Sequence, residues 1–279
     1  MALSAEMGIH YIIGNGQKMT EAENVYVPPK ISIREVSKVY LTKNQKYTAL
    51  DRVSIDITEN EFISVVGPSG CGKSTLLRMI AGLDMPTSGR IWVDGKEVTG
   101  PGAERGMVFQ SYTLFPWLTV AENIAFGPKL KGMSSKKCRE LVDKYLELID
   151  LTDFADRYPK ELSGGMKQRV AIARALANNP EVLLMDEPFG ALDQQTKMSM
   201  QEMLLKIWRH EKITVIFVTH DIDEAIFLAQ KVYVMEARPG RIKASLKVPL
   251  PDKRTGDIKD TMQFIKLRKA IVALLKNYH

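Results

Sequence analysis

The sequence predicts an α/β fold in which a mainly parallel sheet is covered by helices on both faces. Two observations lead to this fold class. Short apolar runs alternate with amphipathic segments in the second half of the chain, and runs such as "EVLLMDEP" and "ITVIFVTH" lack the polar alternation of a strand with one solvated face. Continuously apolar strands that alternate with helices are typical of parallel sheets buried on both sides.

The N-terminal third is expected to consist of strands that follow an extension. Residues 1–29 have no sustained periodicity and end at Pro28-Pro29, which marks a boundary. Residues 89–98 are predicted to form a hairpin with Asp94-Gly95 at its turn. The other strand-like runs of this region are residues 31–40, 51–57, 61–67 and 104–110.

The spacing of apolar residues becomes helical from about residue 117 to 178, which predicts an inserted α-helical subdomain. Strands and helices then alternate again, so the main domain is expected to span residues 30–245. The C-terminal extension, residues 246–279, is predicted to contain an amphipathic helix packed on the body, with contact to a membrane surface as the alternative. Its apolar positions at helical spacing are Phe264, Leu267, Ile271 and Leu274.

The composition is that of a globular protein. Of the 279 residues 45% are hydrophobic and 26% are charged, and no stretch approaches the roughly 18 to 20 apolar residues of a membrane span. The N-terminus lacks the basic region of a signal peptide. The two cysteines, Cys71 and Cys138, suggest no disulfide framework, so we expect a reducing, cytosolic compartment.

The net charge of +6 is concentrated at the C-terminal end. Residues 241–279 hold 10 Lys and Arg against 3 Asp, whereas residues 1–240 hold 29 basic against 30 acidic residues. A basic segment is typical of contact with nucleic acid or an anionic membrane, or of the solvated side of a helix. The near neutrality of the remaining chain argues against a broad nucleic-acid footprint.

A glycine-rich loop carries the first chemical motif. "GPSGCGKST", residues 67–75, satisfies G-x-x-x-x-G-K-[ST] directly after an apolar strand, as a phosphate-binding loop (P-loop) requires. Lys73 is expected to reach the terminal phosphates and the Ser74 hydroxyl to ligate Mg²⁺. Cys71 is interpreted as a small residue whose backbone matters, with a redox switch as the alternative. The residues expected to contact the nucleotide are Gly67, Pro68, Ser69, Gly70, Cys71, Gly72, Lys73, Ser74 and Thr75.

A second motif, "VLLMDEP" at residues 182–188, supplies two carboxylates. The apolar residues predict a buried strand that places Asp186 beside the P-loop, where it helps to hold Mg²⁺. Glu187 is positioned to orient and polarise the attacking water, because phosphoryl transfer depends on placement and charge stabilisation. In isolation, two solvated carboxylates at a strand end would be the default interpretation.

The segment "LSGGMKQRVAIARAL", residues 162–176, resembles the signature sequence of ATP-binding cassette (ABC) ATPases, and Ser163 stands 23 positions before Asp186. The resemblance covers about residues 31–245. It implies a P-loop NTPase core with an antiparallel β subdomain and an inserted α-helical subdomain. It also implies ATP and Mg²⁺ as cofactors.

Other motifs of this family stand in the family's order. Gln110 in "GMVFQ" resembles the Q-loop glutamine, Asp193 in "GALD" the D-loop residue, and His220 in "VIFVTHD" the switch histidine. The resemblance makes His220 a catalytic partner of Glu187 that holds the γ-phosphate and water in line. Gln110 would act as a catalytic sensor of the nucleotide and as a further Mg²⁺ ligand. Tyr40 stands where the family stacks an aromatic ring on adenine, and Tyr47 competes for that role.

In ABC ATPases two copies pack head to tail, and each signature serves the nucleotide of the other copy. The resemblance therefore implies that Ser163, Gly164 and Gly165 meet the γ-phosphate in trans, and that Asp193 lies at the same interface. The partner would be a second copy or a related ATPase subunit, which fits the preference of oligomers for closed symmetry.

The apolar cluster Leu114–Leu118 follows Gln110 in a predicted loop. It is either part of the core or a groove for a partner helix. In ABC transporters this region receives the membrane subunit, so we expect separate permease subunits, an extracytoplasmic solute-binding protein and a peripheral location on the cytoplasmic side of the membrane. "FQSYTLFPWLTVAENIAFG" and "MEARPGRI" are similar to the ATPases of nitrate, sulfonate, taurine and bicarbonate uptake.

A soluble ABC ATPase acting on nucleic acid is the alternative function. Such proteins place long coiled coils between P-loop and signature, whereas Lys73 and Leu162 are only 89 positions apart here without a heptad run. No direct contact with nucleic acid is therefore expected. A nucleotide kinase would not explain the signature segment. The transported solute is not encoded in these motifs, because selectivity belongs to the membrane subunits.

Overall fold

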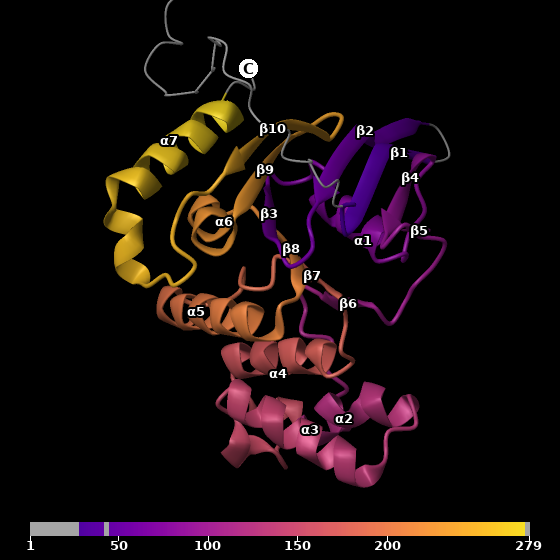
Figure 1. Ribbon diagram of the computed structural model, residues 1–279, viewed down its shortest axis with the longest axis vertical. Coiled ribbons are helices and arrows are strands. Elements are labelled where there is room, and N and C mark those ends of the chain that lie inside the picture. The colour runs from indigo at the N-terminus through magenta and orange to yellow at the C-terminus, as the bar shows by residue number, and fades with distance from the viewer. Residues whose placement is uncertain (1–27, 42–44, 277–279) are drawn as a thin grey trace, which may run out of the picture.

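The computed structural model describes residues 28–41 and 45–276 of the chain. Two sheets form its upper part, with helices around them and a separate group of helices below (Figure 1). The expectation of an N-terminal extension over residues 1–29 falls almost entirely outside the described residues.

The larger sheet has six strands in the order β10-β9-β3-β8-β7-β6. Five of them are parallel, and only β10 runs antiparallel, so the predicted mainly parallel sheet is confirmed. β10 was not expected from the sequence, because its residues alternate between half-buried and exposed and form no apolar run. The strands are β3 (Phe62–Val66), β6 (Arg105–Val108), β7 (Val182–Asp186), β8 (Thr214–Thr219), β9 (Lys231–Glu236) and β10 (Arg241–Lys247).

Both faces of this sheet are buried, which explains its apolar strands. On β7, Leu183 and Met185 belong to one hydrophobic core, whereas Val182 and Leu184 belong to another on the opposite face. The first core is completed by helices α2 to α7, and the second by α1 and the smaller sheet.

The smaller sheet is antiparallel, with the order β2-β1-β4-β5. The predicted hairpin is confirmed, because Trp92 pairs with Glu97 across the Asp94-Gly95 turn. Helix α1 (Lys73–Ile80) packs between the two sheets through residues such as Leu77. The strands are β1 (Ile31–Leu41), β2 (Lys46–Ile57), β4 (Ser88–Val93) and β5 (Lys96–Glu97).

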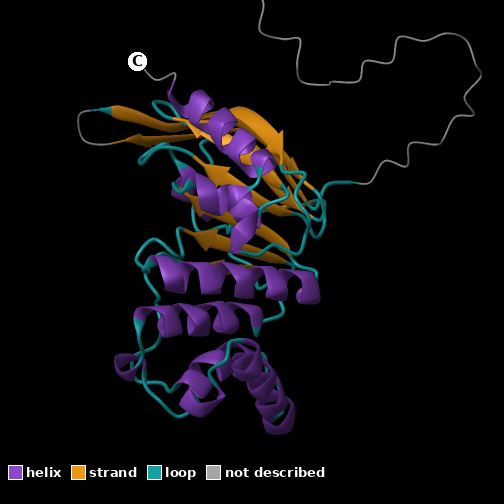
Figure 2. Cartoon of the chain, turned by 90° about the vertical axis from the view of Figure 1, so that its left-hand side faces the viewer, coloured by secondary structure: helices purple, strands orange, loops and turns teal. Residues whose placement is uncertain are grey.

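The helical region lies below the sheets and forms the lower part of the molecule in both views (Figures 1 and 2). Thr119 begins its first helix with a capping box, in which Thr119 and Glu122 each bind the other's backbone N–H. Its helices are α2 (Val120–Leu130), α3 (Ser135–Leu148) and α4 (Gly164–Leu176), with short 3₁₀ turns at Thr152–Phe154 and Pro159–Glu161.

The face of the large sheet opposite α1 is covered by helices α5 (Gln194–Glu211), α6 (Ile222–Leu228) and α7 (Met262–Lys276). In α7, Phe264 and Ile271 are fully buried, and Leu267 and Leu274 pack on the core. The amphipathic C-terminal helix packed on the body is therefore confirmed. Among the described residues, no helix has the length and apolar character needed to cross a membrane.

Phe264→Ala should lower the free energy of unfolding by about 3–5 kcal/mol, because it removes a fully buried ring and leaves a cavity. Denaturant unfolding followed by circular dichroism measures the effect. Met262→Ala in the same helix is the matched control, since Met262 is 68% exposed and its loss should change stability by no more than about 0.5 kcal/mol. Equal effects of the two substitutions would contradict the packing of α7.

Candidate active site

The loop between β3 and α1 ends in a helix start without a side-chain cap. Gly72 is the N-cap of α1, and no side chain hydrogen-bonds to the first turn. The free N–H groups of such a turn and the helix dipole attract an anion. Gly72 has a φ of 98°, and a Cβ there would lie 2.6 Å from Leu50 Cδ2 and 2.9 Å from the carbonyl oxygen of Ala49. Only glycine fits this position.

Lys73 is the first residue of α1, and only 5% of its side chain is exposed. Its Nζ donates to the carbonyl oxygens of Gly67 (2.9 Å) and Pro68 (3.1 Å) and lies 3.7 Å from Glu187 Oε1. The loop thus positions the ammonium group among acceptors.

The Cys71 side chain faces the interior and is fully buried. Burial raises the pKa of the Cys71 thiol above its ordinary value. Because the thiolate is the reactive form, this environment favours an inert thiol and does not support the redox-switch alternative. The interpretation of Cys71 as a small structural residue of the loop agrees with this environment.

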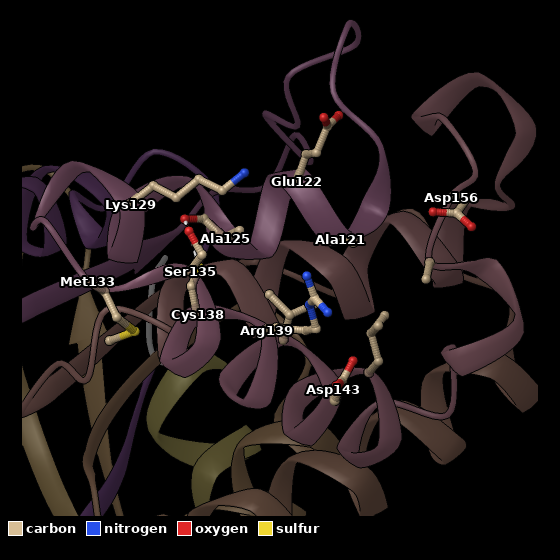
Figure 3. A pocket seen from close by; sticks show the side chains of 13 residues that line it. Ala121, Glu122, Ala125, Lys129, Met133, Ser135, Cys138, Arg139, Asp143 and Asp156 are labelled. Atoms are coloured by element: carbon tan, nitrogen blue, oxygen red, sulfur yellow. Dashed lines mark hydrogen bonds between the residues drawn. The ribbon is translucent and has the colours of Figure 1, made fainter.

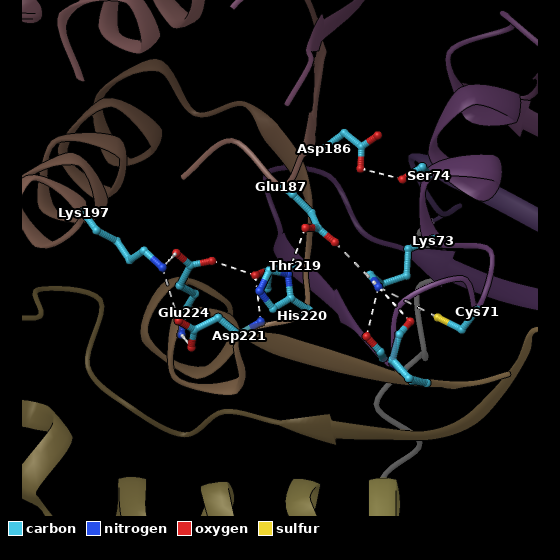
Figure 4. A network of polar contacts seen from close by, with 12 residues as sticks. Cys71, Lys73, Ser74, Asp186, Glu187, Lys197, Thr219, His220, Asp221 and Glu224 are labelled. Carbon is cyan, nitrogen blue, oxygen red and sulfur yellow. Dashed lines mark hydrogen bonds and ion pairs between the residues drawn. The ribbon is translucent and has the colours of Figure 1, made fainter. Parts of the chain in front are cut away.

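Asp186 ends β7 and lies next to the start of α1, as the sequence predicts. The Ser74 hydroxyl donates to Asp186 Oδ1 at 2.8 Å (Figure 4). Burial raises the pKa of Asp186; the bond from Ser74 opposes this effect, and the nearby charge of Glu187 adds to it. A desolvated carboxylate beside a hydroxyl is an all-oxygen donor pair that a bound divalent cation would stabilise.

Glu187 contacts two of the predicted site residues at once. Its Oε2 is 2.8 Å from His220 Nδ1, and its Oε1 faces Lys73 (Figure 4). The backbone of Glu187 has a φ of 43°, an uncommon value for a residue with a side chain, and its N–H donates to the Val218 carbonyl. Strained backbone of this kind persists only where the surrounding structure holds it in place. The hydrogen bond to Val218 of β8 is such a restraint, and it helps to fix the position of the Glu187 carboxylate.

Tyr40 and Tyr47 are direct cross-strand neighbours on β1 and β2, and both are partly exposed. The Tyr40 hydroxyl donates to Asp84 Oδ2 at 2.9 Å, and the Tyr47 hydroxyl lies 3.5 Å from the Gly70 carbonyl oxygen. The Tyr47 ring therefore stands beside the P-loop, and Tyr40 lies next to Tyr47 on the neighbouring strand. The geometry keeps both as candidates for stacking on a base.

The signature segment belongs to α4, whose N-cap is Ser163. The Ser163 oxygen accepts from the Met166 N–H at 3.3 Å and its side chain is exposed, whereas Gly165 is buried. A Cβ on Gly165 would lie 2.6 Å from Thr196 of α5, so this glycine also permits the close packing of α4 on α5. Figure 1 shows α4 below the large sheet, whereas α1 lies between the two sheets.

The remaining predicted residues lie at other strand and helix ends. Asp193 is exposed and caps α5 by accepting from the Thr196 N–H at 3.0 Å. Hydrogen bonds from the side chain and the backbone of Thr196 hold the pKa of Asp193 below its usual value. Gln110 is exposed just beyond β6, the strand next to β7. The structure thus brings five of the predicted residues together through the Ser74–Asp186 and the Lys73–Glu187–His220 contacts. Ser163 and Asp193 lie exposed at the starts of α4 and α5.

The sequence analysis did not predict a buried polar cluster next to His220. Thr219 donates to Glu224 Oε2 at 2.6 Å, and Lys197 lies 3.2 Å from Glu224 Oε1 (Figure 4). Burial raises the pKa of Glu224, and its side chain is only 4% exposed. The available signal was Glu224 directly before the apolar stretch "AIFLA", because a carboxylate that is buried with its apolar neighbours requires partners.

A pocket of about 530 Å³ lies away from these residues, between α2 and α3. Its lining combines apolar residues with charged side chains such as Glu122, Lys129 and Arg139 (Figure 3). None of the predicted site residues lines it, so it is a separate feature of the helical region.

A glycine-rich loop that leads into a helix start open to phosphate, a lysine as the first residue of that helix and an acidic strand end beside it define a P-loop nucleoside triphosphatase. Known proteins specify the class further. A family model described as ABC transporter matches residues 50–190. The nitrate import ATP-binding protein NrtD of Synechocystis is 52% identical over 252 residues, which cover 88% of this chain and 95% of that protein. The aliphatic sulfonates import ATP-binding protein SsuB of Bacillus cereus is 47% identical over 242 residues, 87% and 94% of the two chains.

Solved structures give the same fold. A dimeric ATP-binding cassette in a post-hydrolysis state with ADP and Pi matches with a TM-score of 0.71 and 35% identity, covering 79% of this chain and all of the other. CbiO1 of Clostridium perfringens, part of the transporter complex CbiONQ, matches with a TM-score of 0.73 and 27% identity over 88% of this chain and 96% of its own. The chain belongs to the ABC transporter family. It is an ATP-binding protein with the ABC ATPase fold, an ATPase whose hydrolysis is coupled to transport.

Gly72→Ala should abolish nucleotide binding, because the new methyl group would collide with Leu50 and displace the P-loop. Titration with a fluorescent ATP analogue measures the loss. Gly95→Ala is the control: it has a φ of 70° but no neighbour within 4 Å of a Cβ, so it should cost about 1–2 kcal/mol of stability and leave affinity unchanged. Retained binding in the Gly72 variant would show that the loop tolerates a side chain there.

Proposed function

We propose that this protein is the ATP-hydrolysing subunit of a membrane importer for a small anionic solute, and that it works as a head-to-tail dimer on the cytoplasmic side of the membrane. Residues 30–245 would form the ATPase domain. The observation that carries the proposal is that two helix starts that could each bind phosphate lie on separate parts of one chain. The P-loop with its catalytic network is one, and the exposed helix start at Ser163 is the other.

The reaction follows from the network around Glu187. The P-loop amides and Lys73 would bind the β- and γ-phosphates, and Glu187 would accept hydrogen bonds from the attacking water and polarise it. His220 contacts Glu187 at 2.8 Å and would keep water and γ-phosphate in line. Mg²⁺, when bound, neutralises phosphate charge; Ser74 and Asp186 would hold it together with Gln110. In the described part of the chain no cluster of three or more His, Cys, Asp or Glu could enclose a metal, so phosphate oxygens and water would complete its shell.

A second copy would complete the site. Ser69 and Gly70 are exposed on the P-loop, and Ser163 is exposed at the start of α4. A twofold arrangement that brings the P-loop of one copy to Ser163 of the other forms two equivalent nucleotide sites. The solved relative bound to ADP and Pi is itself dimeric, which supports this arrangement. Asp193, at the exposed start of α5, would lie at the same interface.

A groove beside Gln110 is suited to a permease helix. It has a volume of about 590 Å³ and is lined by β6 and the loops on either side of it, by α2 and by the end of α4. Phe115 packs on Phe126 with ring centroids 4.4 Å apart, and Trp117, 69% exposed, stands next to Phe115. Exposed aromatic rings around a groove are typical of a docking surface for a helix. This docking groove would receive the membrane subunit.

The loop after β6, which lines the docking groove, contacts the signature helix α4 near both ends of that helix. Arg174, in the last turn of α4, donates to the Thr113 carbonyl at 2.8 Å and stacks on Phe115. At the first turn of α4, a Cβ on Gly164 would lie 2.8 Å from the Tyr112 hydroxyl. Displacement of this loop by a permease would therefore move α4 and with it Ser163.

The solute class rests on the relatives. Proteins named for nitrate and aliphatic sulfonate import are 52% and 47% identical to this chain over most of its length. The nucleic-acid alternative has no comparable support, and key basic residues of the C-terminal region have internal partners: Arg254 is 95% buried and Arg268 pairs with Asp223.

Glu187→Gln should stabilise the ATP-bound dimer, because nucleotide binding is retained while the water is no longer polarised. In this variant, Ser69→Cys combined with Ser163→Cys should give covalent dimers when ATP is added under oxidising conditions. The native Cys71 and Cys138 are buried and should not react. Ser69→Cys alone serves as the control on non-reducing gels. Crosslinks that form only within single molecules would overturn the head-to-tail arrangement.

Trp117→Ala should reduce copurification of membrane proteins with a tagged subunit by roughly 10-fold or more, as expected for an exposed aromatic anchor. Met262→Ala, equally exposed but on α7, should copurify them normally. Stimulation of ATP consumption in the copurified complex by nitrate, sulfonates, taurine or bicarbonate would identify the solute. Equal recovery with both variants would place the permease elsewhere.

A further inference from the structure

Helix α6 begins two residues after His220, and the C-terminal extension packs directly against it (Figure 1). α6 comprises only seven residues, Ile222–Leu228. So short a helix has little stability of its own. Four fully buried residues, Ala225, Ile226, Phe227 and Leu228, hold it on the core, and the polar groups bound to its two ends fix its orientation there.

The N-terminal end of α6 is held by Arg268 of α7. The guanidinium binds Asp223 through two parallel bonds, Nε to Oδ1 at 2.6 Å and Nη2 to Oδ2 at 2.8 Å. A two-pronged arginine–carboxylate pair fixes orientation as well as distance.

The C-terminal end of α6 is held by Arg254. Its Nη1 donates to the carbonyl oxygens of Ile226 (3.1 Å), Phe227 (2.7 Å) and Ala229 (2.9 Å). These carbonyls end the helix and have no partner in a further turn. A cation at this position also complements the helix dipole. Burial lowers the pKa of Arg254 to about 10, so it keeps its charge at neutral pH.

The residues directly before and after His220, Thr219 and Asp221, both form hydrogen bonds with α6. Asp221 caps α6 by accepting from the N–H groups of Asp223 and Glu224, and its own N–H donates to the Thr219 hydroxyl at 3.0 Å. Thr219 in turn donates to Glu224, which Lys197 of α5 neutralises (Figure 4). The backbone on each side of His220 is thus tied to α6.

We propose that the C-terminal extension is a positioning element for ATP hydrolysis, in which Arg268 and Arg254 hold α6 and thereby keep the His220 imidazole against Glu187. The inference rests on the proposed role of His220. In this arrangement the basic extension acts on the reaction through the backbone of α6, and its arginines are positioning residues.

Arg268→Gln should lower kcat by roughly 2- to 30-fold, the range of couplings carried through packed elements, and leave KM for ATP within about twofold. Asp223→Gln should have the same effect, and the double variant should be no slower than either single variant. Arg268 is suitable because its side chain is 37% exposed, so its loss should not unfold the protein.

Arg34→Gln is the matched control. Arg34 and Asp56 form the same two-pronged pair on the antiparallel sheet, at 2.7 and 3.0 Å, with both side chains about half exposed. This pair lies on a different sheet from the strands that α6 covers. Thermal unfolding should shift by a similar small amount in Arg34→Gln and Arg268→Gln, whereas kcat should fall only in the latter. If kcat fell by a similar factor in both variants, the loss would reflect lower overall stability, and the inference would be overturned.

His220→Ala separates this inference from the proposed function. A wild-type kcat in His220→Ala would refute the role of His220 itself. A strong loss in His220→Ala together with an unchanged kcat in Arg268→Gln would leave the active site intact and refute only the positioning role of the extension.

Discussion

The arrangement of the candidate active site depends on the contact of one carboxylate with two partners. Glu187 lies 3.7 Å from the Lys73 ammonium and 2.8 Å from the His220 imidazole. These three residues follow three different strands, β3, β7 and β8, which are adjacent in the order β3-β8-β7. Because parallel strands end at the same edge of a sheet, this order brings a lysine, a carboxylate and a histidine together from positions 147 residues apart along the chain.

The sheet must be rigid for this contact to persist. Both of its faces are covered, one by α1 and the antiparallel sheet and the other by α5, α6 and α7. Burial on both sides stabilises the strands over their full length and supports the strained backbone of Glu187, whose N–H is bound to the neighbouring strand. The antiparallel sheet has a second role, because it places Tyr47, with Tyr40 next to it, beside the P-loop.

Elements outside the sheet connect the active site to other surfaces. α4 carries Ser163 at one end and meets the docking groove through Arg174 at the other. α5 carries Asp193 as its N-cap, and its Lys197 pairs with Glu224 of the polar cluster next to His220. α6 links His220 to the C-terminal extension. Helices therefore connect the regions proposed to contact the second copy and the permease with the chemistry at the strand ends.

The fold class, the P-loop and its carboxylate partner could be predicted from the sequence, because apolar periodicity and motif spacing are local properties of the chain. The hairpin at Asp94-Gly95 and the packed helix around Phe264 were predictable for the same reason. Three features became visible only in the folded structure: the edge strand β10, the hydrogen bonds of Arg254 and Arg268 to α6, and the Thr219–Glu224–Lys197 network. These features join residues distant in sequence through single polar contacts, and the partner of a buried charge is decided by how the elements pack.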